Sequence, residues 1–437
     1  MGKPDETWEP WVREATDPKR APAKPEALAR LRVLDLSRAN FGGLYCSSIL
    51  AEFGAEVIRI EPPDGDPARR FTPFGLLHHG TGLPYLVEGR SKFHVTLTLE
   101  APEGRELFLT LARRADVVIE SFTPGTMDGW GIGYRQLSAL NPRLIYCALA
   151  TYGQFGPKAG CGKPDYDVTD QALSGIVWVT GEMETPGDPK PWEVPTKVAS
   201  WLGWYAGGAW AAFAILLALR HRRRSGRGQL IDVSGAEGVM RMINYNIAWY
   251  HTCRELMVRV GNLDQGIYPY GFIRVKDGYI FIAGFSDVNF QAITTLMGRP
   301  DLPKDPRFDS FLKRAKLENA MALKEEMEQW SVRHTAEEIL QMVLAYRGAG
   351  VVGMGRANLP SETLGEAHWW ERGIFQVVDD PVYGKVLIQG QPVKMTETPP
   401  RVKWVCRPVG ADNEFIYLKY LGLGRERLQA LRVRGVL

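Results

Sequence analysis

The sequence contains only incomplete versions of the motifs that bind metals, phosphates or dinucleotides. The seven histidines include no pair four residues apart, and the five cysteines show no spacing typical of a zinc site. Gly162-Lys163 suggests a phosphate-binding loop, but Pro157 and Pro164 stand where that motif requires a glycine and a Ser or Thr. Residues 348–353 match the dinucleotide-binding glycine pattern, yet no long helix follows them, so we interpret them as a turn. We therefore expect no metal and no permanently bound cofactor.

The composition of the chain is that of a soluble globular protein. Of its 437 residues, 45% are apolar and 24% are charged, and 53 Lys plus Arg against 50 Asp plus Glu leave a net charge of +3. A dedicated nucleic-acid-binding protein would need a larger basic surplus. The odd number of cysteines suits a reducing compartment, and the charged, Pro-rich residues 1–25 lack the apolar stretch of a signal peptide. We expect a cytoplasmic protein that binds neither nucleic acid nor membranes.

One segment resembles a membrane span. Residues 201–219 carry no charge, and the basic run 220–224 follows directly. However, Gly203, Gly207 and Gly208 interrupt the segment, and no second segment of this kind exists in the sequence. We interpret it as a buried helix of a large α/β protein, with the arginines at its C-terminal end and Gly226 ending it.

Short apolar runs alternate with helical patterns over the first half of the chain, which is typical of a parallel, doubly wound sheet. We expect the strands of this sheet at residues 32–36, 56–60, 94–99, 116–120, 144–149 and 229–233, and a helix at 235–250. A hairpin pattern at 268–284 and charged amphipathic helices near 314–332 and 335–346 indicate a smaller α+β domain. The sequence therefore predicts an α/β protein with four parts: an extended N-terminal arm (1–30), a large domain (31–255), a small domain (260–375) and a C-terminal return to the large domain (376–437).

Several segments, in this order, resemble the class III CoA-transferase family, also called CaiB/BaiF or formyl-CoA transferase-like. They are Val33-Leu34-Asp35-Leu36-Ser37, residues 54–69 with the run Val57-Ile58-Arg59-Ile60-Glu61-Pro62, residues 115–125 ending in Ser121-Phe122-Thr123-Pro124-Gly125, residues 140–146, Asp165-Tyr166-Asp167 with residues 171–175, and residues 225–234. The resemblance covers about residues 31–400. It implies a Rossmann-like large domain, a small domain and two interlocked protomers.

The resemblance also implies that CoA and acyl-CoA act as substrates. The family positions that line the CoA cleft, or that carry recurring basic residues near it, correspond here to Asn40, Phe41, Arg69, Lys92, Leu97-Thr98-Leu99-Glu100, Ser121-Phe122-Thr123 and Pro164-Asp165-Tyr166-Asp167. The phosphates of CoA would need helix N-termini and cationic side chains.

At the position of the family's nucleophile the sequence departs from the pattern. Members of the family place an aspartate, which forms acyl intermediates, just before the small residues that open the long buried helix. In this chain the stretch is Trp204-Tyr205-Ala206-Gly207-Gly208, so Trp204 stands in the place of the nucleophile. A second departure is Gly129, where the family often has an arginine that reaches a phosphate of CoA. We expect no catalytic residue in this chain, with Asp167 as the substitute nucleophile if one acts.

Without its nucleophile, the chain resembles the non-catalytic subunit of a heteromeric CoA-transferase such as benzylsuccinate CoA-transferase, an enzyme of aromatic degradation. Its expected partner is a homologous active subunit in an interlocked heterodimer or heterotetramer. The pair would move CoA from an acyl-CoA such as succinyl-CoA to a carboxylic acid such as benzylsuccinate. Two alternatives remain open: a self-sufficient class III CoA-transferase or acyl-CoA racemase that uses Asp167, and an acyl-CoA-binding protein without turnover.

Overall fold

The chain divides into two units in the computed structural model, which describes residues 8–160, 162 and 165–437. The larger unit comprises Met1–Ile176, Val198–Asn244 and Glu366–Leu437, and the smaller unit comprises Val177–Lys197 and Tyr245–Gly365. The C-terminal segment therefore belongs to the same unit as the first strands, and each unit is described by itself below.

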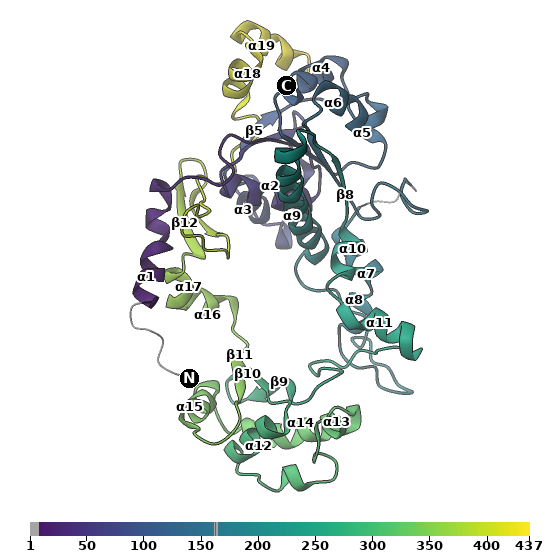
Figure 1. Cartoon of the computed structure of the whole chain (residues 1–437), viewed down its shortest axis with the longest axis vertical. Coiled ribbons are helices and arrows are strands. Elements are labelled where there is room, and N and C mark those ends of the chain that lie inside the picture. Colours follow the sequence, from purple (N-terminus) through teal and green to yellow (C-terminus); the bar gives the residue numbers. More distant parts are fainter. Residues whose placement is uncertain (1–7, 161, 163–164) are drawn as a thin grey trace. The chain divides into compact units, whose positions relative to one another are not determined.

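A six-stranded parallel sheet forms the centre of the larger unit (Figure 1). Its strands are β1 (Arg32–Asp35), β2 (Glu56–Glu61), β5 (Phe93–Thr96), β6 (Val117–Glu120), β7 (Ile145–Ala150) and β8 (Leu230–Ser234). They lie in the order β5-β2-β1-β6-β7-β8. The order runs outward in one direction from β1 and then outward in the other from β6, which is the doubly wound arrangement. The predicted α/β fold with a parallel sheet is confirmed.

Helices cover both faces of this sheet, because each strand presents apolar side chains to both sides. On one face, Val33 and Val57 pack with α2 (Phe41–Glu52) and α9 (Leu202–Ser225). On the other face, Leu34 and Ile58 pack with α4 (Pro102–Ala112), α18 (Asn413–Leu421) and α19 (Arg425–Val433). The C-terminal helices thus complete the core that the first strands begin.

The segment that resembles a membrane span forms α9, which packs closely against α2. A Cβ atom on Gly42 would lie 2.8 Å from the main-chain oxygen of Trp204, so only a glycine allows this approach. The helix ends at Gly226, which adopts a left-handed conformation with φ of 73°. Among the described residues α9 is the one helix long and apolar enough to cross a membrane, and 56% of its most apolar window is buried.

Three local expectations were wrong. The N-terminal arm is not extended, because residues 8–15 form α1 (Trp8–Ala15), whose Pro10 lies in the first turn where no backbone donor is needed. The helix expected over 235–250 breaks into α10 (Gly235–Met240) and α11 (Asn244–Cys253), because the chain leaves the larger unit there. The tail ends in two helices, α18 and α19, where we expected one.

The smaller unit has a three-stranded antiparallel sheet in the order β11-β10-β9. Strands β9 (Tyr270–Val275) and β10 (Gly278–Ala283) form the expected hairpin, and β11 (Gly353–Arg356) follows the glycine pattern at 348–353. A strand therefore follows this pattern in place of the helix that a dinucleotide site requires. The helices of this unit include α12 (Asp287–Leu296), α14 (Leu317–Ser331) and α15 (Ala336–Ala345).

The remaining elements complete the two units. They are β3 (Leu77–His78), β4 (Thr81–Gly82), β12 (Phe375–Asp380), β13 (Gly384–Gln389), α3 (Leu83–Glu88), α5 (Thr126–Gly129), α6 (Tyr134–Leu140), α7 (Asp167–Ser174), α8 (Ile176–Val179), α13 (Phe311–Arg314), α16 (Pro360–Gly365) and α17 (Ala367–Glu371).

Candidate functional site

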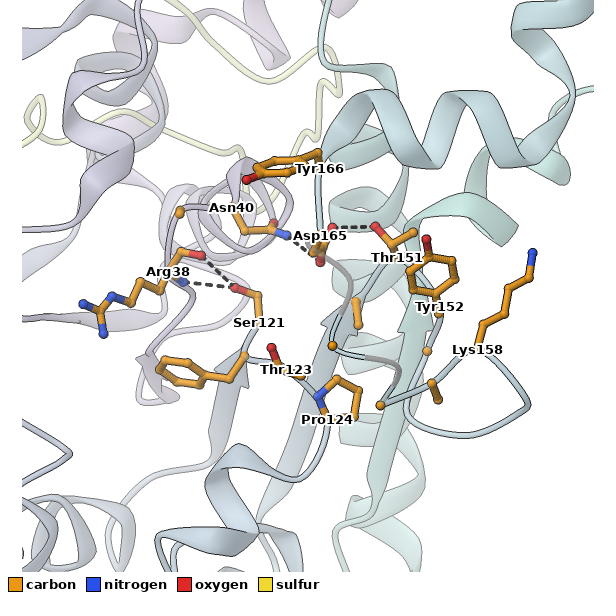
Figure 2. Close-up of a pocket in the computed structure, with 17 residues that line it drawn as sticks. Arg38, Asn40, Ser121, Thr123, Pro124, Thr151, Tyr152, Lys158, Asp165 and Tyr166 are labelled. Atoms are coloured by element: carbon orange, nitrogen blue, oxygen red, sulfur yellow. Dashed lines mark hydrogen bonds between the residues drawn. The ribbon is translucent and has the colours of Figure 1, made fainter.

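A cavity of about 220 Å³ lies at the carboxyl ends of β1, β6 and β7 in the larger unit. Its walls are residues 38–40 after β1, residues 121–124 after β6 and residues 150–153 at the end of β7, together with residues 158–160, Gly162, Asp165 and Tyr166 (Figure 2). The winding of the sheet reverses between β1 and β6, and open α/β sheets bind ligands at such a switch point. We call this space the switch-point cavity.

Asp165 connects two walls of the switch-point cavity. Its Oδ1 accepts a hydrogen bond from the Thr151 hydroxyl at 2.7 Å, and its Oδ2 accepts one from Asn40 Nδ2 at 3.3 Å (Figure 2). Asn40 in turn caps α2, because its Oδ1 accepts the backbone N–H of Gly43 at 3.1 Å. These contacts fix the orientation of the carboxylate.

Burial raises the pKa of Asp165, and the nearby donors Thr151, Trp204 and Asn40 offset part of that rise. Among the described residues that line the cavity, Asp165 is the only carboxylate.

Two cationic side chains lie at the rim of the cavity. Arg38 and Lys158 both line it, and Lys158 is exposed. Arg38 pairs with Glu100 at 3.1 Å, with both side chains about half exposed, so the ion pair is weak and open to exchange with a ligand. In Figure 2 the charged ends of both side chains extend away from Asp165, to opposite sides of the cavity.

Trp204 lies in the first turn of α9 and is only 6% exposed. Its indole stacks on Phe71 at 6.4 Å between ring centroids and on Phe41 at 5.9 Å, and Trp201 lies 5.7 Å away. The side chain is thus part of an apolar cluster that extends to Tyr85 and Cys406. An indole in such surroundings has no acid–base or nucleophilic chemistry to offer.

Asp167 holds the first turn of α9 through its side chain. One carboxylate oxygen accepts the backbone N–H groups of Gly203 at 2.7 Å and of Trp204 at 3.2 Å. The other oxygen accepts Gln171 Nε2 at 2.7 Å. Because the first backbone donors of a helix have no partner within it, this carboxylate acts as the cap of α9.

A third carboxyl group lies in the same region. Asp170 is 1% exposed, and burial together with the negative charge of Asp165 raises its pKa to about 8. Its carboxyl occupies the space where a Cβ atom on Gly235 would lie, so the start of α10 requires a glycine. Asp170 therefore favours its protonated form at neutral pH.

The structure brings only some of the sequence-predicted site residues to the switch-point cavity. Asn40, Phe122 and Tyr166 line it. Phe41 packs on Trp204 behind it, and Leu97 and Leu99 border a separate hollow of about 20 Å³ that Phe122 also lines.

The two predicted cations near the cleft lie elsewhere in the larger unit. Arg69 binds the carboxylate of Glu61 with two nitrogens, at 2.6 and 2.7 Å. Lys92 is fully buried, donates to the Leu44 carbonyl at 2.7 Å, and has its pKa lowered to about 8 by burial. Neither side chain lines the switch-point cavity. The prediction that they contact CoA stays untested.

The sequence analysis missed four polar residues of the cavity: Arg38, Thr151, Tyr152 and Lys158. A signal existed for two of them. Arg38 and Thr151 directly follow predicted strands, and ligands bind outside the carboxyl ends of parallel strands. Lys163 and Pro164, which figured in the rejected phosphate-loop motif, lie outside the described residues. Among the residues that are described, no group of three or more His, Cys, Asp or Glu could hold a metal ion.

Comparison with known proteins gives consistent matches over most of the chain. The model of CoA-transferase family III matches residues 28–413. The chain is 33% identical to succinyl-CoA–D-citramalate CoA-transferase of Chloroflexus aurantiacus, covering 94% of this chain and 98% of that protein. It is 33% identical to the alpha subunit of succinyl-CoA–L-malate CoA-transferase of the same species, with 97% and 96% covered, and 32% identical to the beta subunit, with 94% and 98% covered.

A solved structure of a CaiB/BaiF family protein from Brucella suis superposes on this chain with a TM-score of 0.76 and 27% identity, covering 90% of this chain and 99% of the other.

Proposed function

Since this chain belongs to CoA-transferase family III, we propose that it is the non-catalytic subunit of a heteromeric CoA-transferase. A homologous active subunit supplies the nucleophilic aspartate. The two chains form an interlocked heterodimer or heterotetramer in the cytoplasm, and CoA thioesters are the substrates. The relatives named as alpha and beta subunits support an assembly of two homologous chains.

One observation carries this proposal: Trp204, which the sequence resemblance assigns to the position of the family's nucleophile, is a buried indole. Trp204 stacks on Phe41 and Phe71 and is 6% exposed, so the first turn of α9 presents an apolar ring where the family's reaction needs a carboxylate. An indole cannot form the acyl anhydride through which CoA passes. The sequence between Lys197 and Arg220 contains no Asp or Glu that could replace it.

The self-sufficient alternative, with Asp167 as nucleophile, is less well supported. Both oxygens of Asp167 accept hydrogen bonds, and two of the donors are the backbone N–H groups that open α9. Attack on a thioester would remove the cap of that helix and leave its buried donors without partners, at a cost of about 1–3 kcal/mol for each. These contacts therefore favour Asp167 as the cap of α9 over Asp167 as a nucleophile.

The acceptor that we propose is a 2-substituted succinate. The names of the relatives contain D-citramalate and L-malate, and both acids are succinates substituted at carbon 2. Benzylsuccinate has the same skeleton with a benzyl group at that carbon. These three acids form a graded series for the assay, and benzylsuccinate tests whether the enzyme serves aromatic degradation.

The test uses the full chain alone, a homologous chain with aspartate at the position of Trp204, and the two combined. Each preparation receives succinyl-CoA and one of the three acids, and mass spectrometry measures the new acyl-CoA. We expect no transfer by this chain alone and rapid transfer by the combination. Appreciable formation of the acceptor's CoA ester by this chain alone would refute the assignment.

A further inference from the structure

The switch-point cavity contains a carboxylate for which the proposed transfer reaction has no use. Asp165 lines the cavity, and the hydrogen bonds from Thr151 at 2.7 Å and Asn40 at 3.3 Å hold it in one orientation (Figure 2). Burial raises its pKa, which makes the ionised form a stronger base than an aspartate in water. A carboxylate held in this way can accept a proton from a molecule inside the cavity.

A second carboxyl group, that of Asp170, neighbours Asp165. Asp170 is 1% exposed with a pKa of about 8, and the Thr151 hydroxyl neighbours both aspartates. With a pKa of about 8, Asp170 favours its neutral form at pH 7. Asp165, and not Asp170, lines the cavity and is oriented by Thr151 and Asn40, so a molecule in the cavity meets the Asp165 carboxylate.

The cavity also has room for a reacting group and water. Its volume of about 220 Å³ exceeds by several times the ~30 Å³ that one water molecule takes up in the liquid. Arg38 and Lys158 lie at its rim, and Trp204, which neighbours Asp165, places an indole at the position that we assign to the family's nucleophile. The indole at that position is not a nucleophile, whereas a water molecule beside Asp165 can act as one once the carboxylate accepts its proton.

We propose that this chain, independently of CoA transfer, hydrolyses CoA thioesters in the switch-point cavity with Asp165 as the general base. The choice of a CoA thioester as the ligand rests on the proposed function. Asp165 takes a proton from a water molecule as the water oxygen bonds to the carbonyl carbon of the thioester. The carbon–sulfur bond then breaks, and the thiolate takes the proton from Asp165. The products are a carboxylic acid and free CoA, and the carboxylate is regenerated.

The first experiment measures free thiol released from succinyl-CoA by the full chain, with no acceptor acid and no partner. We expect slow release, which Asp165→Asn lowers by about 10²- to 10⁴-fold, the usual contribution of a general base. Asp165→Glu should recover part of the activity because it restores a base. Asp128→Asn is the matched control, since Asp128 is a carboxylate outside this cavity, and it should release thiol like the wild type. Thermal unfolding of each variant checks that the fold is intact.

A second experiment distinguishes a general base from a covalent intermediate. In a single turnover in ¹⁸O-labelled water, the general-base reaction places the label in the product acid and none in Asp165. Label in the peptide that contains Asp165, or thiol release that is equal in wild type and Asp165→Asn, would overturn the inference. Neither result bears on the proposed function, which fails only if this chain alone makes the CoA ester of the acceptor.

Discussion

At the scale of single residues, Trp204 occupies a position that its surroundings make unsuitable for another negative charge. Asp165, Asp167 and Asp170 all lie around the first turn of α9, and the charges of the first two already help to raise the pKa of the third. A further carboxylate at position 204 would meet this field and also lack the space-filling contacts of the indole. The surroundings of position 204 therefore favour an indole over a carboxylate.

Restoring the aspartate should not restore the reaction. We expect Trp204→Asp to give little or no CoA transfer by this chain alone, and Trp204→Asp with Gly129→Arg to give at most a trace. An arginine–phosphate contact contributes about 1.5–3 kcal/mol, or about ten- to a hundredfold in affinity, but a misplacement of about 1 Å in the reacting groups outweighs it. Transfer from succinyl-CoA to L-malate measures the outcome, and turnover comparable to that of the active partner would contradict the argument.

Removing the indole should leave the chemistry of the complex intact. We expect Trp204→Ala, assembled with the proposed active subunit, to transfer CoA at nearly the unchanged rate, because under the proposed function the reacting carboxylate belongs to the partner. The variant should unfold more easily by about 3–5 kcal/mol, the usual cost of truncating a buried tryptophan to alanine. Trp204→Phe is a milder control that keeps an aromatic ring. If turnover collapses while the complex stays assembled, Trp204 belongs to a working site.

At the scale of elements, the close packing of α2 and α9 positions Trp204 against Phe41. The approach depends on glycines, since a Cβ atom on Gly42 would lie 2.8 Å from the main-chain oxygen of Trp204 and 3.0 Å from Asn40 Oδ1. Both atoms belong to groups that the site uses, because Asn40 holds Asp165 and the first turn of α9 carries Trp204. The packing of α2 against α9 therefore also positions residues at the switch-point cavity.

A methyl group between the two helices should separate them. We expect Gly42→Ala to lower the free energy of unfolding by about 1–3 kcal/mol, the range for overpacking, because main-chain atoms of α9 cannot rotate away. Gly129→Ala is the matched control, because a Cβ atom there meets nothing within 4 Å. It should be neutral or stabilising by up to about 1 kcal/mol, since alanine favours helix over glycine. Urea denaturation compares the two, and equal stability would contradict this packing argument.

At the scale of the whole molecule, buried polar contacts attach the C-terminal return to the strands of the first half. The backbone N–H of His94 donates to Asp412 at 2.8 Å, and that of Thr96 donates to Asn413 at 2.8 Å. The imidazole of His94 pairs with Glu61 at 2.8 Å. Burial opposes its charged form, but Cys406 and Glu61 outweigh burial and raise the pKa of His94 to about 9. The stability of the contact between β5 and the C-terminal return should therefore depend on pH.

The raised pKa of His94 determines how the free energy of unfolding changes with pH. Because His94 titrates near 9 in the folded protein and near 6.5 when unfolded, its stabilising contribution is complete below about pH 6.5 and disappears as the pH rises through about 9. We expect wild type to be more stable than His94→Gln at pH 6, with the difference shrinking by pH 9. Urea unfolding of both proteins across this range measures it. A difference that stays constant or grows with pH would contradict the assigned ion pair.

The sequence by itself determined the α/β class, the strands of the parallel sheet, the long buried helix and the absence of a carboxylate at position 204. Each of these follows from local information. Apolar runs at strand spacing predict buried strands wherever the neighbours lie, and a tryptophan cannot act as a carboxylate in any surroundings. Short stretches of sequence are therefore enough to predict the fold class, and they also contain the main evidence for the proposed role.

Only the tertiary structure decided which polar side chains share a cavity. Arg69 and Lys92 have the types expected of CoA contacts, but they bind Glu61 and the Leu44 carbonyl inside the larger unit. Asp165 reaches the switch-point cavity because Asn40 and Thr151, which are 125 and 14 residues away in sequence, donate to it. The physical reason is that a buried charge must find a partner, and the fold, not the local pattern, determines which partner lies within reach.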